Sequence, residues 1–335
     1  MSDSFDYRAV GGTPIYLGGE EVWSFGYRPP AARWPEENEA LANEQPLDLA
    51  IDGNTIYPKA GEKVLLTDLW KHPSVVAAIG FEFPGFIQHT GSCVGVGSGD
   101  VCFTLLSLEV VRLGDPEQIH VPFWPLTYGR GRYHSGIRGR GDGSSGTGQA
   151  KAYREDGTVP AKTDGLPTFS IKDGMLSVGS SVELDWSDGA RISTAWLEKS
   201  RKHPVQKTAL CRNADDVREA ILNGYPVTEA SMYGFNARVE GTPPALVGRR
   251  GPRWAHQMSL QGHWVHPQLG ELFWLMNQWG GGAHGKDPAG GPAGGVWITK
   301  ADVDWICNDQ EVYAFSQFQG FPANPDLLNW LTIWK

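Results

Sequence analysis

Gly91-Ser92-Cys93 stands a short distance before a long apolar run that begins at Val101. The run from Val101 to Leu113 has apolar residues on most faces of a helix, as a buried central helix requires. A thiol near the N-terminus of such a helix lies in the partial positive charge of the helix dipole, which lowers its pKa. This stretch therefore predicts a reactive cysteine close to the start of a central helix.

Two motifs follow in an order that suits a cysteine nucleophile. His256 opens the apolar run 256–260, and Asn277 opens Asn277-Gln278-Trp279-Gly280. A thiol is mostly protonated at neutral pH, so a nucleophilic cysteine needs a histidine that takes its proton. The imidazole needs a fixed amide oxygen to set its tautomer and orientation. We predict Cys93 as nucleophile, His256 as acid and base, and Asn277 as the residue that orients His256.

The three motifs resemble those of the papain-like cysteine peptidases, which read roughly Gln-Gly-x-Cys-Gly-Ser-Cys-Trp, then a histidine opening an apolar strand, then Asn-Ser-Trp-Gly. The counterparts in this chain are Gln88 to Cys93, His256 to Leu260, and Asn277 to Gly280. Residues 215–227 are similar to the family's helix that ends in Gly-x-Pro-Val and enters a strand. The resemblance covers about residues 80 to 320.

The resemblance implies an α+β, two-part papain-like fold. A helical half would carry the nucleophile on its central helix, and an antiparallel, barrel-like β half would carry His256 and Asn277. Gln88 would stabilise the oxyanion, and Trp279 would shield the hydrogen bond between Asn277 and His256. The implied activity is that of a thiol protease, a hydrolase that cleaves peptide bonds of a peptide or protein substrate. Neither a cofactor nor a metal is implied.

The surroundings of Cys93 depart from the family pattern at three places. Gln88 lies five residues before Cys93, where the family usually has six, and this spacing predicts a poor reach to the oxyanion. Val94 replaces an aromatic residue, and the glycines within residues 95–99 each cost about 1 kcal/mol of helix propensity, which predicts a loose first turn. Thr90 stands where secreted members often have a disulfide cysteine. These departures make the oxyanion hole the part of the site that differs most from the family pattern.

Composition narrows the class of protein. The chain has 335 residues, of which 40% are hydrophobic and 20% charged, as in a globular protein with a substantial core. A net charge of −9 without a stripe of Lys and Arg argues against nucleic acid as a partner. No stretch approaches the roughly 18 apolar residues of a membrane helix, so no membrane partner is expected.

Cysteine usage and the first residues bear on the compartment. Cys102, Cys211 and Cys307 lack Cys-x-x-Cys spacing and are expected to be small buried hydrophobic residues. The first residues lack the basic region and apolar run of a signal peptide. We therefore expect a cytoplasmic location.

Residues 1–75 are interpreted as an N-terminal extension or docking arm, and residues 76–335 as the papain-like domain. The first 60 or so residues are rich in Pro, Gly and turn residues, with one acidic helical candidate at Pro35–Ala42. Zymogens of the family carry a helical propeptide that blocks the groove, and this extension lacks the long periodic helix of such a segment. We expect it to dock, for example in a protein assembly.

Several further elements follow from local composition. Residues 128–148 contain eight glycines, too many for a helix or a packed strand, and predict a mobile surface loop. A short helix over residues 149–157 with a glycine at its C-terminus follows. Strands are expected at Phe273–Met276 and Gly295–Thr299.

Alternative hypotheses remain at this stage. Gly91 to Gly95 also fits Gly-x-Cys-x-Gly, the cysteine form of the nucleophile elbow of α/β-hydrolases, which needs a strand before the cysteine. A second alternative is a papain-like fold used as a structural or assembly component, for example of a phage virion, with weak or no peptidase activity. A third is the same chemistry on an amide outside proteins. His256, His263 and His266 match no usual zinc spacing, so no metal site is predicted.

Overall fold

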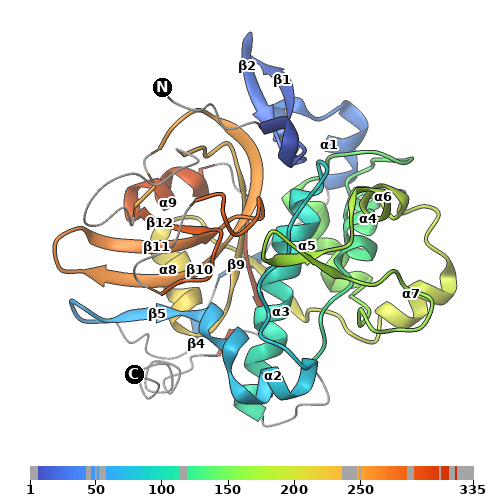
Figure 1. Ribbon diagram of the computed structural model, residues 1–335. Coiled ribbons are helices and arrows are strands. Elements are labelled where there is room, and N and C mark those ends of the chain that lie inside the picture. Colours follow the sequence, from blue (N-terminus) through green and yellow to red (C-terminus); the bar gives the residue numbers. More distant parts are fainter. Residues whose placement is uncertain are drawn as a thin grey trace.

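A computed structural model describes residues 7–42, 47–49, 51–52, 58–113, 119–235, 247–248, 250–284, 290–308, 311–316 and 321–322. One half is a curled mixed sheet with two helices beside it, and the other half is helical, with one long helix between them (Figure 1). The expected α+β, two-part architecture is confirmed. None of the helices within these ranges is long and apolar enough to cross a membrane.

The helices, in chain order, are η1 (Tyr7–Val10), η2 (Pro30–Ala32), α1 (Pro35–Ala42), η3 (Leu66–Lys71), α2 (Pro73–Ile79), α3 (Cys93–Leu113), α4 (Trp124–His134), α5 (Gly146–Glu155), α6 (Ser180–Asp185), α7 (Thr194–Ser200), α8 (Ala214–Leu222) and α9 (Lys300–Cys307). The strands are β1 (Thr13–Leu17), β2 (Glu20–Ser24), β3 (Leu47–Asp48), β4 (Ile51–Asp52), β5 (Lys63–Leu65), β6 (Ser170–Lys172), β7 (Met175–Ser177), β8 (Lys207–Leu210), β9 (Val227–Ser231), β10 (Trp254–His266), β11 (Gly270–Met276), β12 (Gly295–Thr299), β13 (Val312–Ser316) and β14 (Phe321–Pro322).

Strand β10 organises the sheet because it pairs with four other strands. Its residues 256–260 pair with β9, residues 259–266 with β11, and residues 262–264 with β5, all antiparallel. Its first two residues pair in parallel with the end of β2. His256 therefore lies inside the sheet, next to the point where the N-terminal chain joins it.

Helix α3 is continuous from Cys93 to Leu113, so the loose first turn expected from its glycines is not found. A Cβ atom at Gly95 would lie 2.6 Å from the Cβ of Tyr128, and one at Gly99 would lie 3.0 Å from the Cβ of Trp124. The glycines allow α4 to pack closely against α3, and this packing offsets their low helix propensity.

The prediction of a mobile loop over residues 128–148 is wrong at both ends of that range. Helix α4 continues through Gly129 and Gly131, and α5 begins at Gly146. A Cβ atom at Gly131 would lie 2.2 Å from Oε1 of Gln149, and one at Gly148 would lie 2.6 Å from the carbonyl oxygen of Gly131. These glycines serve the close approach of two helices, not chain mobility.

The other predicted elements are confirmed. They are the acidic helix α1, the helix and strand α8 and β9, the strands β11 and β12, and the short helix before Gly157, which is observed as α5. Gly157 has a φ of +66° directly after the helix, as a C-terminal glycine should.

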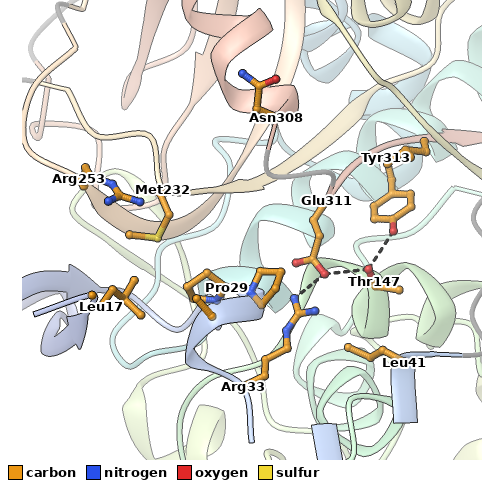
Figure 2. Close-up of a pocket in the computed structure, with 14 residues that line it drawn as sticks. Leu17, Pro29, Arg33, Leu41, Thr147, Met232, Arg253, Asn308, Glu311 and Tyr313 are labelled. Atoms are coloured by element: carbon orange, nitrogen blue, oxygen red, sulfur yellow. Dashed lines mark hydrogen bonds and ion pairs between the residues drawn. The ribbon is translucent and has the colours of Figure 1, made fainter. Parts of the chain in front are cut away.

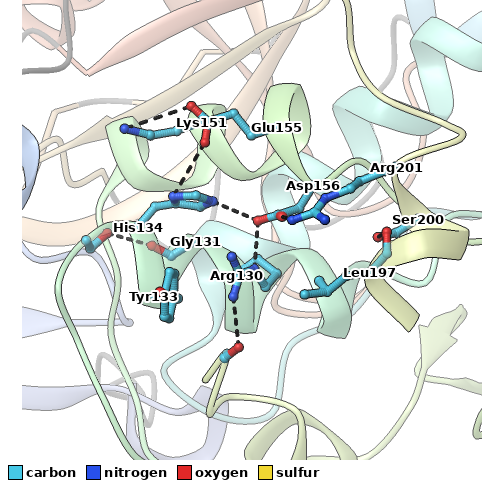
Figure 3. A network of polar contacts seen from close by, with 12 residues as sticks. Arg130, Gly131, Tyr133, His134, Lys151, Glu155, Asp156, Leu197, Ser200 and Arg201 are labelled. Atoms are coloured by element: carbon cyan, nitrogen blue, oxygen red, sulfur yellow. Dashed lines mark hydrogen bonds and ion pairs between the residues drawn. The ribbon is translucent and has the colours of Figure 1, made fainter. Parts of the chain in front are cut away.

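Asp156 joins the side chains of Arg130, His134 and Arg201 in the helical half (Figure 3). Its Oδ2 accepts from Nε of Arg130 at 2.7 Å and lies 2.7 Å from Nε2 of His134, and its Oδ1 accepts from Arg201 at 3.2 Å. Burial alone would raise the pKa of Asp156, but the hydrogen bonds from His134 and Arg130 outweigh burial and lower it to about 2. The charged carboxylate thereby holds α4, α5 and the end of α7 together.

Glu183 in α6 holds the segment that precedes Cys93. Its carboxyl group, fully buried, accepts hydrogen bonds from the backbone N–H groups of His89 and Thr90, from Oγ1 of Thr90 at 2.8 Å and from Oγ of Ser92 at 2.7 Å. Burial raises the pKa of Glu183 from 4.5 to about 7, although the hydrogen bonds from Ser92 and Thr90 oppose this shift. The carboxyl group of Glu183 therefore holds Thr90 by hydrogen bonds, at the position where secreted members of the family often have a disulfide cysteine.

The raised pKa of Glu183 should make the free energy of unfolding depend on pH. Between its ordinary pKa and about 7, the folded protein holds a proton that the unfolded chain releases, so stability falls as the pH rises. Relative to Glu183→Gln, the wild type should lose on the order of 2 kcal/mol between about pH 5 and about pH 7.5. Urea denaturation of both proteins at the two pH values measures this.

A matched variant tests the cause. Thr90→Val keeps the carboxyl group and removes one donor to its charged form, so it should keep or steepen the pH dependence of the wild type. An unchanged pH dependence in Glu183→Gln would contradict the assignment to this group.

Candidate active site

Cys93 is the first residue of α3 and is fully buried. Its Sγ accepts a hydrogen bond from the backbone N–H of Gln257 at 3.3 Å, so the thiol lies against the strand that carries His256. A backbone N–H in the first turn of a helix has no acceptor within the helix. That of Cys93 donates to the carbonyl oxygen of Phe25 at 3.3 Å. Cys93 thus contacts the sheet and the N-terminal chain from the start of the central helix.

His256 and Asn277 are brought together as predicted. Nε2 of His256 lies 2.8 Å from Oδ1 of Asn277. An amide oxygen can only accept, so Nε2 carries the proton, and Nδ1 of the neutral ring holds the free electron pair. Nδ1 is buried, and no hydrogen-bond partner for it lies within the described ranges. The imidazole is therefore in the tautomer that can take a proton at Nδ1.

The amide of Asn277 is fixed from several sides. Its Oδ1 also accepts from the backbone N–H of Gln278 at 2.8 Å, and its Nδ2 donates to Nε2 of His284 at 2.9 Å. The ring of Trp279 lies beside that of His256, with the centroids 5.3 Å apart and an angle of 31° between the planes. These contacts prevent an amide flip, so His256 meets an oxygen and not an NH2 group.

The side-chain amide of Gln88 lies among backbone carbonyl groups near the start of α3. Its Nε2 lies 3.5 Å from the carbonyl oxygen of Phe25, the same oxygen that accepts from the N–H of Cys93. The same amide nitrogen lies 3.1 Å from the carbonyl of Val10 and 3.2 Å from that of Thr90. The Cys93 N–H and the Gln88 amide nitrogen thus both lie within 3.5 Å of one carbonyl oxygen, that of Phe25.

The N-terminal segment, residues 7–42, covers this site. Strand β2 leads into Phe25, whose N–H donates to the carbonyl of Ala255 at 2.8 Å. Beyond it, the carbonyl of Gly26 accepts from Ser144 at 2.7 Å, and the N–H of Arg28 donates back to Ser144 at 2.8 Å. Backbone hydrogen bonds therefore hold the segment to both halves of the fold.

Glycines make this close fit possible. Gly26 has a φ of +111°, and a Cβ atom there would lie 1.9 Å from the carbonyl oxygen of Gly91. A Cβ atom at Gly11 would lie 2.5 Å from the carbonyl carbon of Thr90. Side chains at either position would push the segment away from the residues before Cys93.

Burial keeps the thiol and the imidazole of the covered site in their neutral forms. Burial raises the pKa of the Cys93 thiol well above its ordinary value and lowers the pKa of His256 to about 3, although the hydrogen bond to Asn277 opposes the latter shift. Removing both groups from water disfavours their charged forms. The thiol and the imidazole are therefore both neutral at physiological pH while the segment is in place.

Several contributors were not found from the sequence. Phe25 stacks near His256 and Trp279, with ring centroids 5.1 and 4.6 Å apart, and no local motif marks it. No local motif marks Asp100 either, yet its buried carboxyl accepts from Nε2 of Gln278 at 3.2 Å and so ties α3 to the residue after Asn277. Burial raises the pKa of Asp100 to about 8.

The remaining titratable candidates have structural partners. His263 lies 2.9 Å from Glu271, and His266 accepts through Nδ1 from the backbone that follows β10. No group of three or more residues suited to a metal occurs in the part of the chain that the structure describes. Cys102, Cys211 and Cys307 are buried free thiols, as expected. No strand precedes Cys93 within residues 80–92, so the α/β-hydrolase elbow is not formed.

The chain is similar to known proteins in its fold. No protein-family model and no curated protein sequence matches the chain. Among solved structures, xylellain, a cysteine protease from Xylella fastidiosa, is similar at 13% identity and a TM-score of 0.51 over 82% of this chain and 99% of its own. A procathepsin B from Trypanosoma congolense is similar at 11% identity and a TM-score of 0.51 over 86% of this chain and 90% of its own. The chain therefore has the fold of the papain-like cysteine proteases.

Proposed function

We propose that the protein is a thiol-dependent hydrolase of peptide bonds, with Cys93 as nucleophile. The observation that carries the proposal is the convergence at Phe25: two donors, from Cys93 and Gln88, meet on one peptide carbonyl oxygen beside the thiol. A carbonyl held in this way is where negative charge develops when a thiolate attacks it. The aligned pair of His256 and Asn277 supplies the base.

The mechanism follows from these positions. Nδ1 of His256 takes the proton of the Cys93 thiol, and the thiolate attacks the substrate carbonyl carbon. The oxyanion that forms accepts from the Cys93 N–H and from Nε2 of Gln88. His256 then gives its proton to the leaving amine, and a water molecule hydrolyses the thioester with His256 as base. Asn277 keeps the ring in the required tautomer, and Trp279 excludes water from their hydrogen bond.

We further propose that the N-terminal segment keeps the hydrolase latent. It fills the place of a substrate at the thiol, and it desolvates Cys93 and His256 so that neither forms its charged, reactive state. When the segment leaves, water and the imidazolium of His256 can again stabilise the thiolate. The division into a residue 1–75 extension and a residue 76–335 catalytic domain remains part of this proposal.

A structural or assembly role without peptidase activity is the second candidate. The fully buried thiol favours it, because a protein that never opens its cleft has no use for a nucleophile. Hydrolysis of an amide outside proteins is the third, and it would use the same residues. Opening the cleft by mutation separates the first two candidates.

Gly26→Ala should open the site. The new methyl group meets the carbonyl of Gly91, so the segment must shift. Iodoacetamide should then alkylate Cys93 at neutral pH at least about tenfold faster than in the wild type, because the segment covers the thiol in a smaller fraction of the molecules. Mass spectrometry of the labelled peptide follows the rate. Gly18→Ala is the matched control, because Gly18 also has a positive φ, in the same segment, but its Cβ would meet nothing within 4 Å.

Phe25→Ala provides an independent way to loosen the segment, because it removes the ring contacts with His256 and Trp279. Labelling that stays at the wild-type rate in both Gly26→Ala and Phe25→Ala, in proteins that unfold cooperatively, would refute the covering role.

The opened protein should hydrolyse peptide bonds. Gly26→Ala should digest a denatured protein such as casein, and adding Cys93→Ala should abolish this activity. Adding Asn277→Ala should lower kcat/KM on the order of 10²-fold, since His256 loses the acceptor that fixes its tautomer. Hydrolysis that survives Cys93→Ala, or rapid labelling without any hydrolysis, would favour the competing candidates.

A further inference from the structure

Three buried side chains form one hydrogen-bonded relay, which consists of His256, Asn277 and His284. Nε2 of His256 lies 2.8 Å from Oδ1 of Asn277, and Nδ2 of Asn277 lies 2.9 Å from Nε2 of His284. His256 and Asn277 are fully buried, and His284 is 4% exposed. A second imidazole therefore contacts the proposed base through a single amide group.

Such a relay can run in two directions, because each ring nitrogen can either donate or accept. In the forward direction, His256 donates from Nε2 to the amide oxygen, and the amide NH2 group donates to Nε2 of His284. If the amide of Asn277 turns over, its oxygen faces His284 and its NH2 group faces His256. In this reverse direction His284 donates from Nε2, whereas Nε2 of His256 accepts and its proton sits on Nδ1.

Only the forward direction leaves His256 able to act as a base toward Cys93. The proposed mechanism takes the thiol proton at Nδ1, which has a free electron pair in the forward direction and a proton in the reverse direction. The ring of His256 is neutral in both. The position of one proton, and not the charge of the ring, therefore decides whether the base is available.

A further contact biases the relay toward the forward direction. The backbone N–H of Gln278 is buried and donates to Oδ1 of Asn277 at 2.8 Å, and after a turn of the amide it would face an NH2 group. Protonation of His284 reverses this bias, because an imidazolium can only donate. Its contact with the NH2 group is then repulsive, and turning the amide replaces it with a hydrogen bond from a charged donor, which is stronger than one between neutral groups.

We propose that His284 is a positioning residue that sets the direction of this relay, and that proton uptake at His284 turns the Asn277 amide and withdraws the base. The proton comes from the solvent and stays on His284, whereas His256 releases its proton at Nε2 and takes one up at Nδ1. The consequence for activity rests on the proposed function, since a turned amide stops a hydrolase only if His256 is its base. Acid thereby inactivates the hydrolase by a route separate from protonation of His256.

Aromatic rings surround His284. Phe235 and Trp279 lie with their centroids 4.9 and 5.9 Å from that of His284, and Tyr7 of the N-terminal segment packs against Trp279 at 5.9 Å. A charge on His284 acts on His256 and lowers its pKa further. Since this repulsion is mutual, a proton on His284 keeps His256 neutral, as the reverse direction requires.

Charged groups on the neighbouring elements pair with one another. Residues 235 and 250 form a bridge, and from these two stretches Tyr233 hydrogen-bonds Asp302 while Nε of Arg250 lies 4.0 Å from the same carboxylate. Glu311 pairs with Arg33 in a separate pocket, which no member of the relay lines (Figure 2). A proton on the second imidazole would therefore be held by the amide oxygen of the relay.

The test uses the full-length, covered protein, in which burial lowers the pKa of His256 to about 3. His256 therefore stays neutral at about pH 5, and its tautomer reports the direction of the relay. Nitrogen NMR of protein labelled in its histidine rings distinguishes a protonated from a bare ring nitrogen, and His256→Ala assigns the signals. The proton of His256 should sit on Nε2 at about pH 8 and on Nδ1 in at least about half of the molecules at about pH 5.

His284→Gln separates the positioning role from a structural one. Glutamine places an amide near the position of Nε2, can accept from Asn277 and takes up no proton, so the tautomer of His256 should be the same at both pH values. His263→Gln is the matched control and should keep the wild-type response. His263 is also fully buried, and its Nε2 lies 2.9 Å from Glu271, outside the relay.

Two outcomes would overturn the proposal. One is a wild type in which the proton of His256 stays on Nε2 at about pH 5, and the other is a tautomer change that persists in His284→Gln. Urea denaturation at both pH values checks that each variant is folded.

A hydrolysis arm separates this proposal from the proposed function. Gly26→Ala, with and without His284→Gln, is assayed on casein at about pH 5 and about pH 7.5, and each rate is divided by the rate of the same protein at the higher pH. The double variant should retain at least about threefold more of its activity in acid, because its base is not withdrawn. Equal retained fractions, or hydrolysis without a tautomer change, refute the relay and leave the hydrolase standing. A tautomer change without any hydrolysis refutes the hydrolase and leaves the relay standing.

Discussion

The hydrogen bond from the backbone of Cys93 to the carbonyl of Phe25 is the contact on which the rest of the structure depends. The first N–H groups of a helix need acceptors from elsewhere, and α3 is buried at this end, so water is not at hand. The N-terminal segment supplies the acceptor. The segment is itself held at the edge of β10, where the N–H of Phe25 donates to the carbonyl of Ala255. Both halves of the fold therefore enclose the thiol.

Three buried carboxyl groups differ in the partners that compensate for their loss of hydration. Asp156 is surrounded by Arg130, His134 and Arg201, and it stays charged at all physiological pH values. Glu183 has only neutral donors, which are too weak to cancel its desolvation, and it titrates near neutrality. Glu311 has neutral donors from the body and a cation from the segment. The first group is a permanent tie, whereas the charge balance of the third depends on where the segment lies.

Much of the candidate site could be predicted from local sequence. Cys93, His256 and Asn277 each stand at the end or start of an element with a strong pattern, so short motifs were enough to place them. Glycine was misread at residues 128–148, because a composition count cannot separate a flexible turn from two helices that need to touch at Gly131 and Gly148. Propensity is a weak guide where tertiary packing supplies the compensation.

Partners that are distant in sequence could not be predicted. Glu183 lies 91 residues from Ser92, and Arg33 lies 278 residues from Glu311. Neither residue stands in a periodic pattern that points to its partner. The covering role of the N-terminal segment was missed for a related reason. A long periodic helix is the sequence pattern typical of a blocking segment, whereas this segment is held by a two-stranded ribbon, a few backbone hydrogen bonds and glycines that allow close contact.

The parallel pairing of β2 with β10 joins residues 23–24 to residues 254–255 within a single chain. A partner on the same chain is present at an effective concentration set by the tether and not by how much protein is in solution. Dilution therefore does not release the segment from Cys93, as it would release a separate inhibitor. Under the latency proposed above, cutting the connection after Arg33 or a competing partner for the ribbon would shift the balance from the covered form toward an open form.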